Sequence, residues 1–144
     1  MEEGIAALSK QEIQKLPVLS LSYVGDSVFD IYIRMIAAGR HHLNAKDSHS
    51  FTVKLVNAVS QSAMAEYLIE HDLYTGEEQD IFRRGRNAKP AHLPKNASVA
   101  DYHRATGFEA VLGYLYMTGD RDRAFTICEL AYRSTLPGEG EEDS

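Results

Sequence analysis

Two acidic residues lie in apolar surroundings, which makes them the first candidates for chemistry. Asp26 follows Gly25 inside a long apolar segment, and Glu109 follows Gly107 by two positions in another. We expect both carboxylates to be buried, where they need a partner, a proton or a metal ion. Carboxylate oxygens from two packed helices suit Mg²⁺, which keeps waters that can meet a phosphate. The residues alone favour carboxylates paired with arginine or tyrosine over a metal site.

The glycines beside these carboxylates need an explanation of their own. Glycine destabilises a helix interior by about 1 kcal/mol relative to alanine. We therefore expect another helix, or a ligand, to approach closely at Gly25 and at Gly107.

The positive charge of the chain is concentrated in one segment. The formal net charge of −6, taken alone, argues against nucleic-acid binding. Residues 83–104 nevertheless contain a single acidic residue, Asp101, and six basic ones: Arg83, Arg84, Arg86, Lys89, Lys95 and Arg104. A basic segment on an acidic body suits phosphate groups. A solvated loop without a binding role is an equally good interpretation.

Apolar residues recur at spacings of three and four, which predicts an all-α helical bundle. Ser9 and Thr75 each begin a capping box, and Ser98 suits the start of the helix that carries Glu109. The predicted helices begin at Ser9, run from Pro17 to Gly39, from Phe51 to His71, from Thr75 through Phe82, from Ser98 to Gly119 and from Arg121 to Arg133. Residues 86–96 contain two prolines and are predicted to form a loop.

The composition is that of one ordinary globular domain, with 44% hydrophobic and 25% charged residues among 144. We expect a catalytic domain over residues 1–136 and a disordered acidic tail over 137–144. Asp26, Asp30 and Arg34 interrupt the most apolar stretch, which argues against a membrane span. The acidic first residues do not resemble a secretory signal. The single cysteine, Cys128, suits a reducing compartment and a cytoplasmic protein.

The segments around both carboxylates resemble a known family. LSYVGDSV at 21–28 is similar to the ribonuclease III signature, in which a Leu-Gly-Asp-Ala/Ser-Val core lies on a helix. TGFEAVLGYLY at 106–116 is similar to that family's second motif. The short chain and RRGRNAK at 83–89 resemble the Mini-ribonuclease III subgroup, which lacks a double-stranded-RNA-binding domain. The resemblance extends from about Leu16 to Arg133 and implies a ribonuclease III-like endonuclease domain.

The sequence departs from full-length ribonuclease III at three acidic positions. The family has glutamates where this chain has Leu19 and Ser22, and an aspartate where it has Thr106. The resemblance therefore leaves two metal-binding carboxylates, the reduced set of the Mini-ribonuclease III subgroup. The hydroxyls of Ser22 and Thr106 are candidates to hold metal-bound waters, and Asp30, one turn after Asp26, is a candidate for the surroundings of the metal.

The function that the resemblance implies is hydrolysis of double-stranded RNA by a metal-activated water, with Mg²⁺ held by Asp26 and Glu109. The implied contacts to phosphates and 2′-hydroxyls come from Arg83, Arg84, Arg86, Asn87 and Lys89. The family acts as a homodimer with one site per subunit. The subgroup's implied task is maturing the ends of the 23S ribosomal RNA precursor, with a large-subunit ribosomal protein as a candidate partner.

Two alternatives belong to other functional classes. The first is a non-catalytic ribonuclease III-like module that binds RNA or associates with the ribosome, although such a role gives no reason to keep buried carboxylates. The second is a helical protein-interaction domain, which is favoured only if the basic segment has no role.

Overall fold

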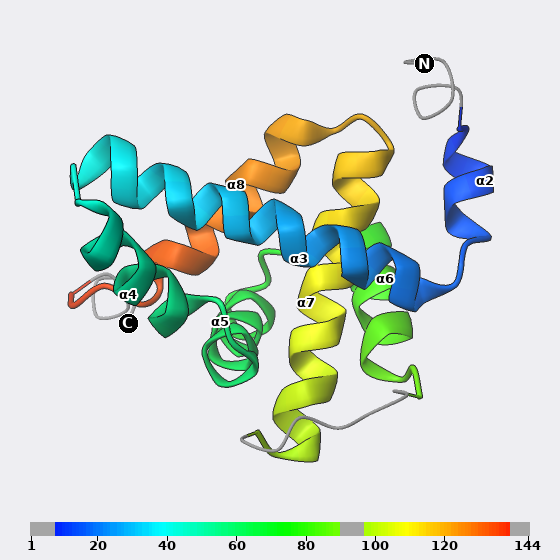
Figure 1. The fold of residues 1–144 in the computed structure, drawn as a ribbon. Helices are drawn as coiled ribbons and strands as arrows, with labels where there is room; N and C mark the ends of the chain where they lie inside the picture. Colours follow the sequence, from blue (N-terminus) through cyan, green and yellow to red (C-terminus); the bar gives the residue numbers. More distant parts are fainter. Residues whose placement is uncertain (1–7, 90–96, 139–144) are drawn as a thin grey trace.

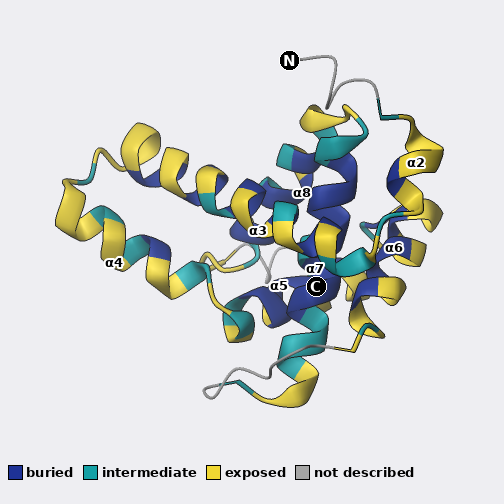
Figure 2. Cartoon of the chain, turned by 45° about the vertical axis from the view of Figure 1, so that its right-hand side comes forward, coloured by how far each residue is buried: buried dark blue, intermediate teal, exposed yellow. Residues whose placement is uncertain are grey.

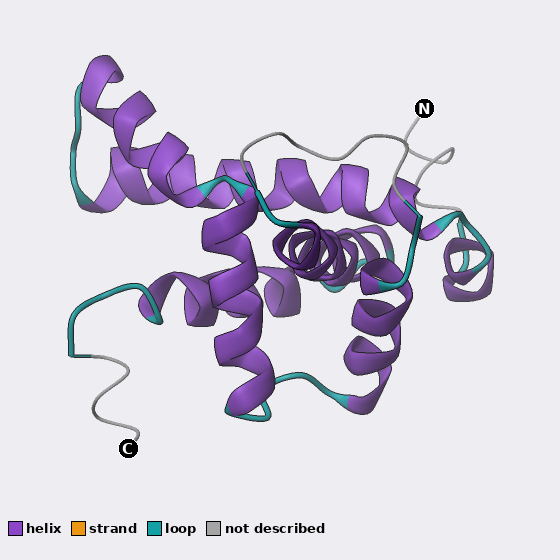
Figure 3. Ribbon diagram, turned by 90° about the horizontal axis from the view of Figure 1, so that it is seen from below, coloured by secondary structure: helices purple, strands orange, loops and turns teal. Residues whose placement is uncertain are grey.

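The computed structural model describes residues 8–89 and 97–138. Every regular element in these residues is a helix (Figure 3), which confirms the predicted all-α class. In chain order the elements are α2 (Lys10–Gln14), α3 (Val18–Met35), the π-helix η1 (Ile36–Arg40), α4 (Ala45–Leu55), α5 (Ala58–Glu70), α6 (Gly76–Arg86), α7 (Val99–Met117) and α8 (Arg121–Arg133).

Helix α7 is the centre of the bundle. It contacts α3, α5, α6 and α8, and α3 crosses it in Figure 1. Within residues 105–115 of α7, every residue is buried except Glu109. A helix that is apolar on all sides must be surrounded by other elements. The edge of the Phe29 ring on α3 meets the Phe108 ring at a centroid distance of 5.2 Å. Glu109 is thus the charged residue within the buried part of the core helix.

Three predicted helix starts are confirmed by their caps. Ser9 accepts a hydrogen bond from the backbone N–H of Glu12, and the Glu12 side chain accepts one from Ser9 in return. Thr75 forms the same reciprocal pair with Glu78. The Ser98 hydroxyl accepts from the N–H of Asp101 at the start of α7. Each cap satisfies donors that a helix start otherwise leaves unpaired.

The predicted continuous helix from Phe51 to His71 is wrong, because Asn57 divides it into α4 and α5. The Asn57 amide donates to the carbonyl oxygens of Val53 at 2.9 Å and Lys54 at 3.0 Å, at the end of α4. Its Oδ1 accepts from the N–H of Ser60 at 2.9 Å, which caps α5. The break lets α5 pack on α7, whereas α4 packs on α3, η1 and α5.

The far end of α3 passes directly into η1, so the predicted helix end near Gly39 is confirmed. Arg40 donates to both carboxylate oxygens of Glu129 on α8, at 3.1 and 2.7 Å, and Tyr32 also donates to Glu129. These bonds fasten the end of α3 to α8. Beyond it, α4 extends from the body with mostly exposed residues (Figure 2).

Parts of two sequence predictions lie outside the described residues. These are positions 90–96 of the predicted loop and positions 139–144 of the predicted acidic tail. The extent of the catalytic domain and the nature of the tail remain predictions. Within the described ranges, no helix is both long enough and apolar enough to cross a membrane.

Candidate active site

Helices α3 and α7 cross with their backbones in direct contact. A Cβ atom added at Gly25 would lie 1.7 Å from the carbonyl oxygen of Glu109. A Cβ atom at Gly113 would lie 1.8 Å from the carbonyl oxygen of Leu21. Only glycine fits at either position, so the close approach predicted at Gly25 is confirmed. The contact brings Asp26, the next residue on α3, beside Glu109.

A second glycine contact fixes α6 against the same part of α7. A Cβ atom at Gly107 would lie 2.7 Å from the carbonyl oxygen of Phe82, and one at Gly85 would lie 2.8 Å from the Cα of Gly107. The close approach predicted at Gly107 is therefore confirmed. The last turn of α6 packs on α7 only two residues before Glu109.

The two carboxylates differ in their surroundings. Glu109 is half-buried but Asp26 is exposed, so the expectation that both are buried is wrong for Asp26. Successive helix residues are rotated by about 100°, and with Gly25 facing α7, Asp26 is turned to the edge of the contact. Burial, together with the charge of Asp26 and a hydrogen bond with it, raises the pKa of Glu109 to about 9. A cation bound beside Glu109 would favour its charged form.

Both carboxylates line two hollows in the surface. The first, of about 220 Å³, is bounded by α3, α7 and the start of α5. The second, of about 360 Å³, is bounded by α3 and α7 and includes Ser22, Tyr23 and Thr106. The carboxylate pair can therefore be reached by a hydrated ion and by a larger ligand.

The donor set fits a hydrated divalent cation. In the described part of the chain, no group of three or more Asp, Glu, His or Cys side chains is placed to hold a metal. Asp26 and Glu109 also form no ion pair with a described lysine, arginine or histidine. Mg²⁺ typically binds through one or two carboxylates and keeps several waters. Two carboxyl groups side by side, with no cationic partner among the described residues, match that requirement.

Comparison with known proteins decides the family. The model of the Ribonuclease III domain family matches residues 19–120. The chain belongs to the ribonuclease III family. It is 40% identical over 129 residues to the Mini-ribonuclease 3 of Thermoanaerobacter sp. (strain X514), covering 90% of this chain and 89% of that protein. It is 39% identical over 111 residues to the Mini-ribonuclease 3 of Staphylococcus aureus (strain NCTC 8325 / PS 47), covering 77% and 83%. The resemblance predicted from the motifs is confirmed.

A solved structure agrees with the ribonuclease III-like fold. The crystal structure of a Fusobacterium nucleatum protein superimposes with a TM-score of 0.75, covering 87% of this chain and 98% of that one. The sequences are 24% identical, so this likeness concerns the fold alone. Family membership makes this chain an endonuclease of the ribonuclease III type.

The three residues predicted to support the carboxylates have different positions in this ribonuclease III domain. The Ser22 hydroxyl donates to the carbonyl oxygen of Thr106 at 2.9 Å, and the Thr106 hydroxyl donates to that of Tyr102 at 2.9 Å. Both side chains line the larger of the two hollows, but their hydroxyl protons are donated to backbone carbonyl oxygens. Asp30 pairs with Arg34 at 3.0 Å and lines neither hollow. Water binding by Ser22 and Thr106 stays a prediction.

The predicted RNA-binding residues begin inside a helix, because α6 continues to Arg86 where a loop was predicted. Arg83 pairs with Asp80 at 2.9 Å, and Arg84 donates to the carbonyl oxygen of Leu16 at 3.4 Å. Among the described residues, Arg84, Arg86 and Lys89 form no ion pair and are exposed. Asn87 follows as the C-cap of α6.

The charge of Arg104, at the end of the same basic segment, is used elsewhere. Arg104 pairs with Glu66 at 3.1 Å and with Asp101 at 3.3 Å, and it donates to the Ser62 hydroxyl at 2.7 Å. Among the described cations of this segment, those left without an ion pair are therefore Arg84, Arg86 and Lys89, at the end of α6 and just after it.

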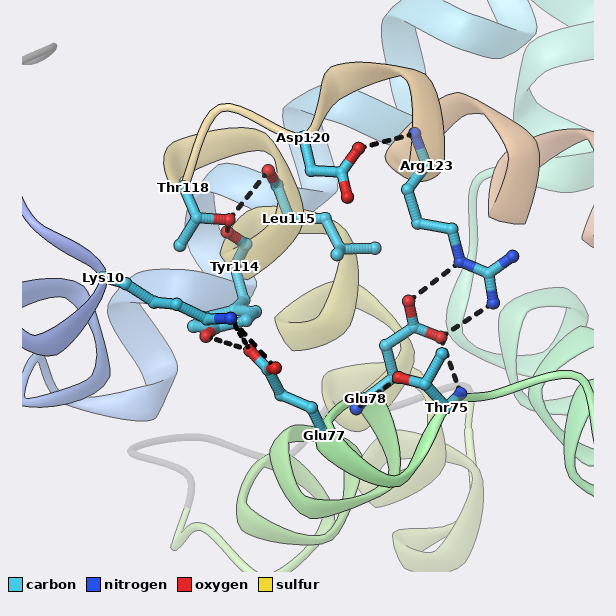
Figure 4. Close-up of a pocket in the computed structure, with 9 residues that line it drawn as sticks. All are labelled: Lys10, Thr75, Glu77, Glu78, Tyr114, Leu115, Thr118, Asp120 and Arg123. Atoms are coloured by element: carbon cyan, nitrogen blue, oxygen red, sulfur yellow. Dashed lines mark hydrogen bonds and ion pairs between the residues drawn. The ribbon is translucent and has the colours of Figure 1, made fainter.

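A third hollow, of about 410 Å³, lies away from the carboxylate pair, between α2, α6 and the α7–α8 turn (Figure 4). Four of its charged side chains form two ion pairs, and the fifth, Asp120, accepts from the backbone N–H of Arg123 at 3.2 Å. Lys10 pairs with Glu77 at 2.9 Å, and Arg123 pairs with Glu78 at 2.9 Å. Tyr114 donates to Glu77. The hollow is larger than those beside Asp26, but its polar groups are satisfied within the protein.

The sequence interpretation missed Gln61, which lines the smaller hollow together with Asp26 and Glu109. Gln61 lies on α5 and is 3% exposed. In the sequence it stands among serines and alanines that carry no motif. Its proximity to the carboxylates depends on the break at Asn57, which the apolar spacing did not reveal.

Proposed function

We propose that this chain cleaves double-stranded RNA at a site formed by Asp26 and Glu109, with Mg²⁺ as the cofactor. The observation that carries the proposal is the pairing of these carboxylates at the Gly25–Gly113 contact, with no cationic partner in the part of the chain that the structure describes. Bound there, Mg²⁺ would polarise a phosphoryl oxygen and lower the pKa of the attacking water. The protein supplies a rigid pair of oxygen ligands at the edge of two hollows, so a side-chain nucleophile is not needed.

The RNA grip in this proposal comes from the exposed cations at the end of α6, with the adjacent Asn87. Arg84, Arg86 and Lys89 have no competing ion pair in the described residues, and Gly85 packs against α7 at the site. Arg83 would have to leave Asp80 to contribute. A-form RNA is recognised mainly by its shape and its backbone, which suits contacts of this kind.

A homodimer is the second part of the proposal, because cutting both strands of a duplex requires two sites. The outer face of α3 exposes Tyr23 by 82%, Ile31 by 52% and Met35 by 48%. Ile31 and Met35 are four positions apart and share one face of α3, and Tyr23 lies about two turns earlier, so these exposed apolar side chains offer a surface suited to a two-fold interface. Light scattering should report a dimer under conditions of activity. A monomer that cleaves duplex RNA would contradict this assembly.

Similarity to Mini-ribonuclease 3 proteins supports a more specific role in the cell. We propose that the substrate is the 23S ribosomal RNA precursor in the cytoplasm, and that a large-subunit ribosomal protein helps to present it. Precursor transcripts with and without that protein would test this role separately from cleavage of a simple duplex.

The basic experiment is incubation of the full chain with duplex RNA, in Mg²⁺ and in EDTA. We expect double-strand cleavage in Mg²⁺ alone, with single-stranded RNA of the same sequence left intact. Binding without cleavage would instead favour a non-catalytic RNA-binding module. Neither binding nor cleavage would favour a protein-interaction domain.

A further inference from the structure

The hollow of about 220 Å³ beside the carboxylates has two kinds of wall. Asp26 and Glu109 supply acceptor oxygens, whereas Asn57 and Ala58 line it from the start of α5. The first N–H groups of a helix have no acceptor inside the helix, and they carry the positive end of its dipole. Asn57 satisfies only the N–H of Ser60 among these. The start of the 13-residue helix α5 therefore offers hydrogen-bond donors to the hollow.

Gln61 adds a second, independent feature to this wall. Its side chain is almost fully buried and lines the same hollow. Its Nε2 has no hydrogen-bond partner among the described residues. The amide lies close enough to Glu109 to lower the pKa of that carboxyl, yet no hydrogen bond of good geometry forms. Buried polar groups are nearly always satisfied, so an unpaired amide facing a hollow points to a ligand.

The ligand that fits must satisfy donors on one side and approach carboxylates on the other. The space is larger than a single water molecule, which occupies about 30 Å³ in the liquid, so it can admit a larger ligand. An anion with several acceptor oxygens would satisfy Gln61 and the start of α5, as phosphates do at helix N-termini. A divalent cation held by Asp26 and Glu109 would remove the repulsion between that anion and the carboxylates.

We propose that the start of α5 and the Gln61 amide form a binding subsite for a backbone phosphate of the RNA, beside the carboxylate pair. The inference rests on the proposed function, because duplex RNA supplies the phosphate. The subsite places Gln61 in contact with the substrate, whereas the cations at the end of α6 grip the duplex elsewhere.

The first test replaces Gln61 with leucine, which keeps the side-chain size and removes both donors. At saturating Mg²⁺ we expect kcat/KM for duplex RNA to fall about tenfold to a hundredfold, the range for a hydrogen bond to a charged group. The melting temperature without divalent ions should stay the same or rise, because an unpaired buried amide is removed. Gln79→Leu, the same change at an exposed position of α6, should leave kcat/KM unchanged.

A second variant tests the sign of the charge that the wall accepts. Ala58→Asp, at the first position of α5 and in the wall of the hollow, suits the helix dipole, leaves the Asn57 caps intact and adds a negative charge. We expect KM for duplex RNA to rise at least about threefold, while the melting temperature stays within a degree or two of the parent value. An unchanged or lower KM would contradict an anion subsite.

Titrating each variant with Mg²⁺ alone, followed by melting temperature, separates the phosphate from the cation. The proposal requires the Mg²⁺ midpoint of Gln61→Leu to stay near that of the parent protein while kcat/KM falls. A shifted midpoint with normal kcat/KM at saturating Mg²⁺ would assign Gln61 to the cation's waters and overturn the phosphate subsite. Normal values of both would overturn it as well. Failure of the proposed function is a distinct outcome, because the parent protein itself would then not cleave the duplex.

Discussion

Glu78 and Glu109 are both acidic residues on helices of the core, but their surroundings are opposite. Glu78 is 3% exposed, and its oxygens accept hydrogen bonds from Arg123, each at 2.9 Å, and from the N–H of Thr75. The charged neighbour of Glu109 is another carboxylate, Asp26. Where a buried acid has a structural task, the chain supplies the cation itself. At Glu109 the cation has to come from outside, which is the physical basis for a metal site.

The largest effect should come from removing either metal-binding carboxylate. We expect Asp26→Asn or Glu109→Gln to lower kcat for duplex RNA by about a thousandfold or more, because metal-assisted stabilisation of the transition state is lost. Single-turnover cleavage assays measure this loss. Near-normal cleavage by either purified variant would remove that residue from the site.

Asp26→Asn and Glu109→Gln should not weaken the fold, whereas removing an acid with a structural role would weaken it. In the absence of divalent ions, the folded pKa of Glu109 of about 9 lies above its ordinary value of 4.5. The unfolded chain then holds fewer protons than the folded chain between these values, so ionisable Glu109 lowers stability as the pH rises. Glu109→Gln should therefore raise the melting temperature in EDTA at pH 8 more than at pH 5. A fall in melting temperature at pH 8 would place Glu109 with the structural acids.

The helix crossing that holds the pair can be tested by adding one methyl group. Gly25→Ala forces a Cβ to within 1.7 Å of the Glu109 carbonyl oxygen, so α3 and α7 must separate. We expect a loss of about 3 kcal/mol in the free energy of unfolding, at the upper end for overpacking, together with a large loss of cleavage. Chemical denaturation and the RNA assay measure the two effects.

Gly39→Ala is the matched control, because an added Cβ there meets nothing within 4 Å. It should leave cleavage unchanged and raise stability slightly. Equal losses in both variants would show that the substitution of glycine, rather than the close contact at Gly25, is responsible.

Arg123, the partner of the structural acid Glu78, should show the opposite result: a loss of stability without a loss of cleavage. Arg123→Met leaves Glu78 without its cation, and breaking a buried pair of this kind lowers stability by about 3–5 kcal/mol. Because the Arg123 side chain is 27% exposed, we expect a smaller loss of about 2 kcal/mol. Cleavage per folded molecule at low temperature should be normal. A loss of kcat without loss of stability would connect this network to the reaction.

How much the sequence reveals depends on whether a feature is local. The caps at Ser9, Thr75 and Ser98 are correct because capping needs only residues three positions apart. The glycine beside Asp26 correctly predicts a close contact, because its effect on a helix demands compensation. The motifs identify both carboxylates, and the structure brings them together as the resemblance implies.

The features that the sequence interpretation missed depend on tertiary structure. Asn57 is both the end of one helix and the cap of the next, and the apolar stripe that continues across it concealed the break. Gln61 reaches the hollow only because of that break. The exposure of Asp26 follows from which face Gly25 turns toward α7, and helical periodicity alone does not fix that orientation.

The smallest effect concerns the basic end of α6, whose side chains are exposed, in contrast to the half-buried Glu109. Replacing Arg84 and Arg86 together with alanine should weaken binding to all duplexes about equally, because backbone contacts carry no base information. Each lost phosphate contact should reduce the log–log slope of affinity against salt by roughly 0.7–0.9. Affinity is measured at several salt concentrations with Asp26→Asn in Ca²⁺, so that cleavage does not interfere.

The control for this measurement is Arg121→Ala, on the exposed first turn of α8, where the guanidinium stacks over Tyr116 at 4.8 Å. General attraction to RNA would change its slope as much per removed charge as the α6 variant does. A specific grip would leave the Arg121→Ala slope at the parent value. An unchanged slope in the Arg84 and Arg86 variant would mean that the end of α6 is only a solvated surface. The phosphate grip would then depend on the wall of the hollow at Gln61 and the start of α5. Gln61→Leu would reveal this by a lower affinity at every salt concentration with an unchanged slope, because a neutral amide releases no counterion.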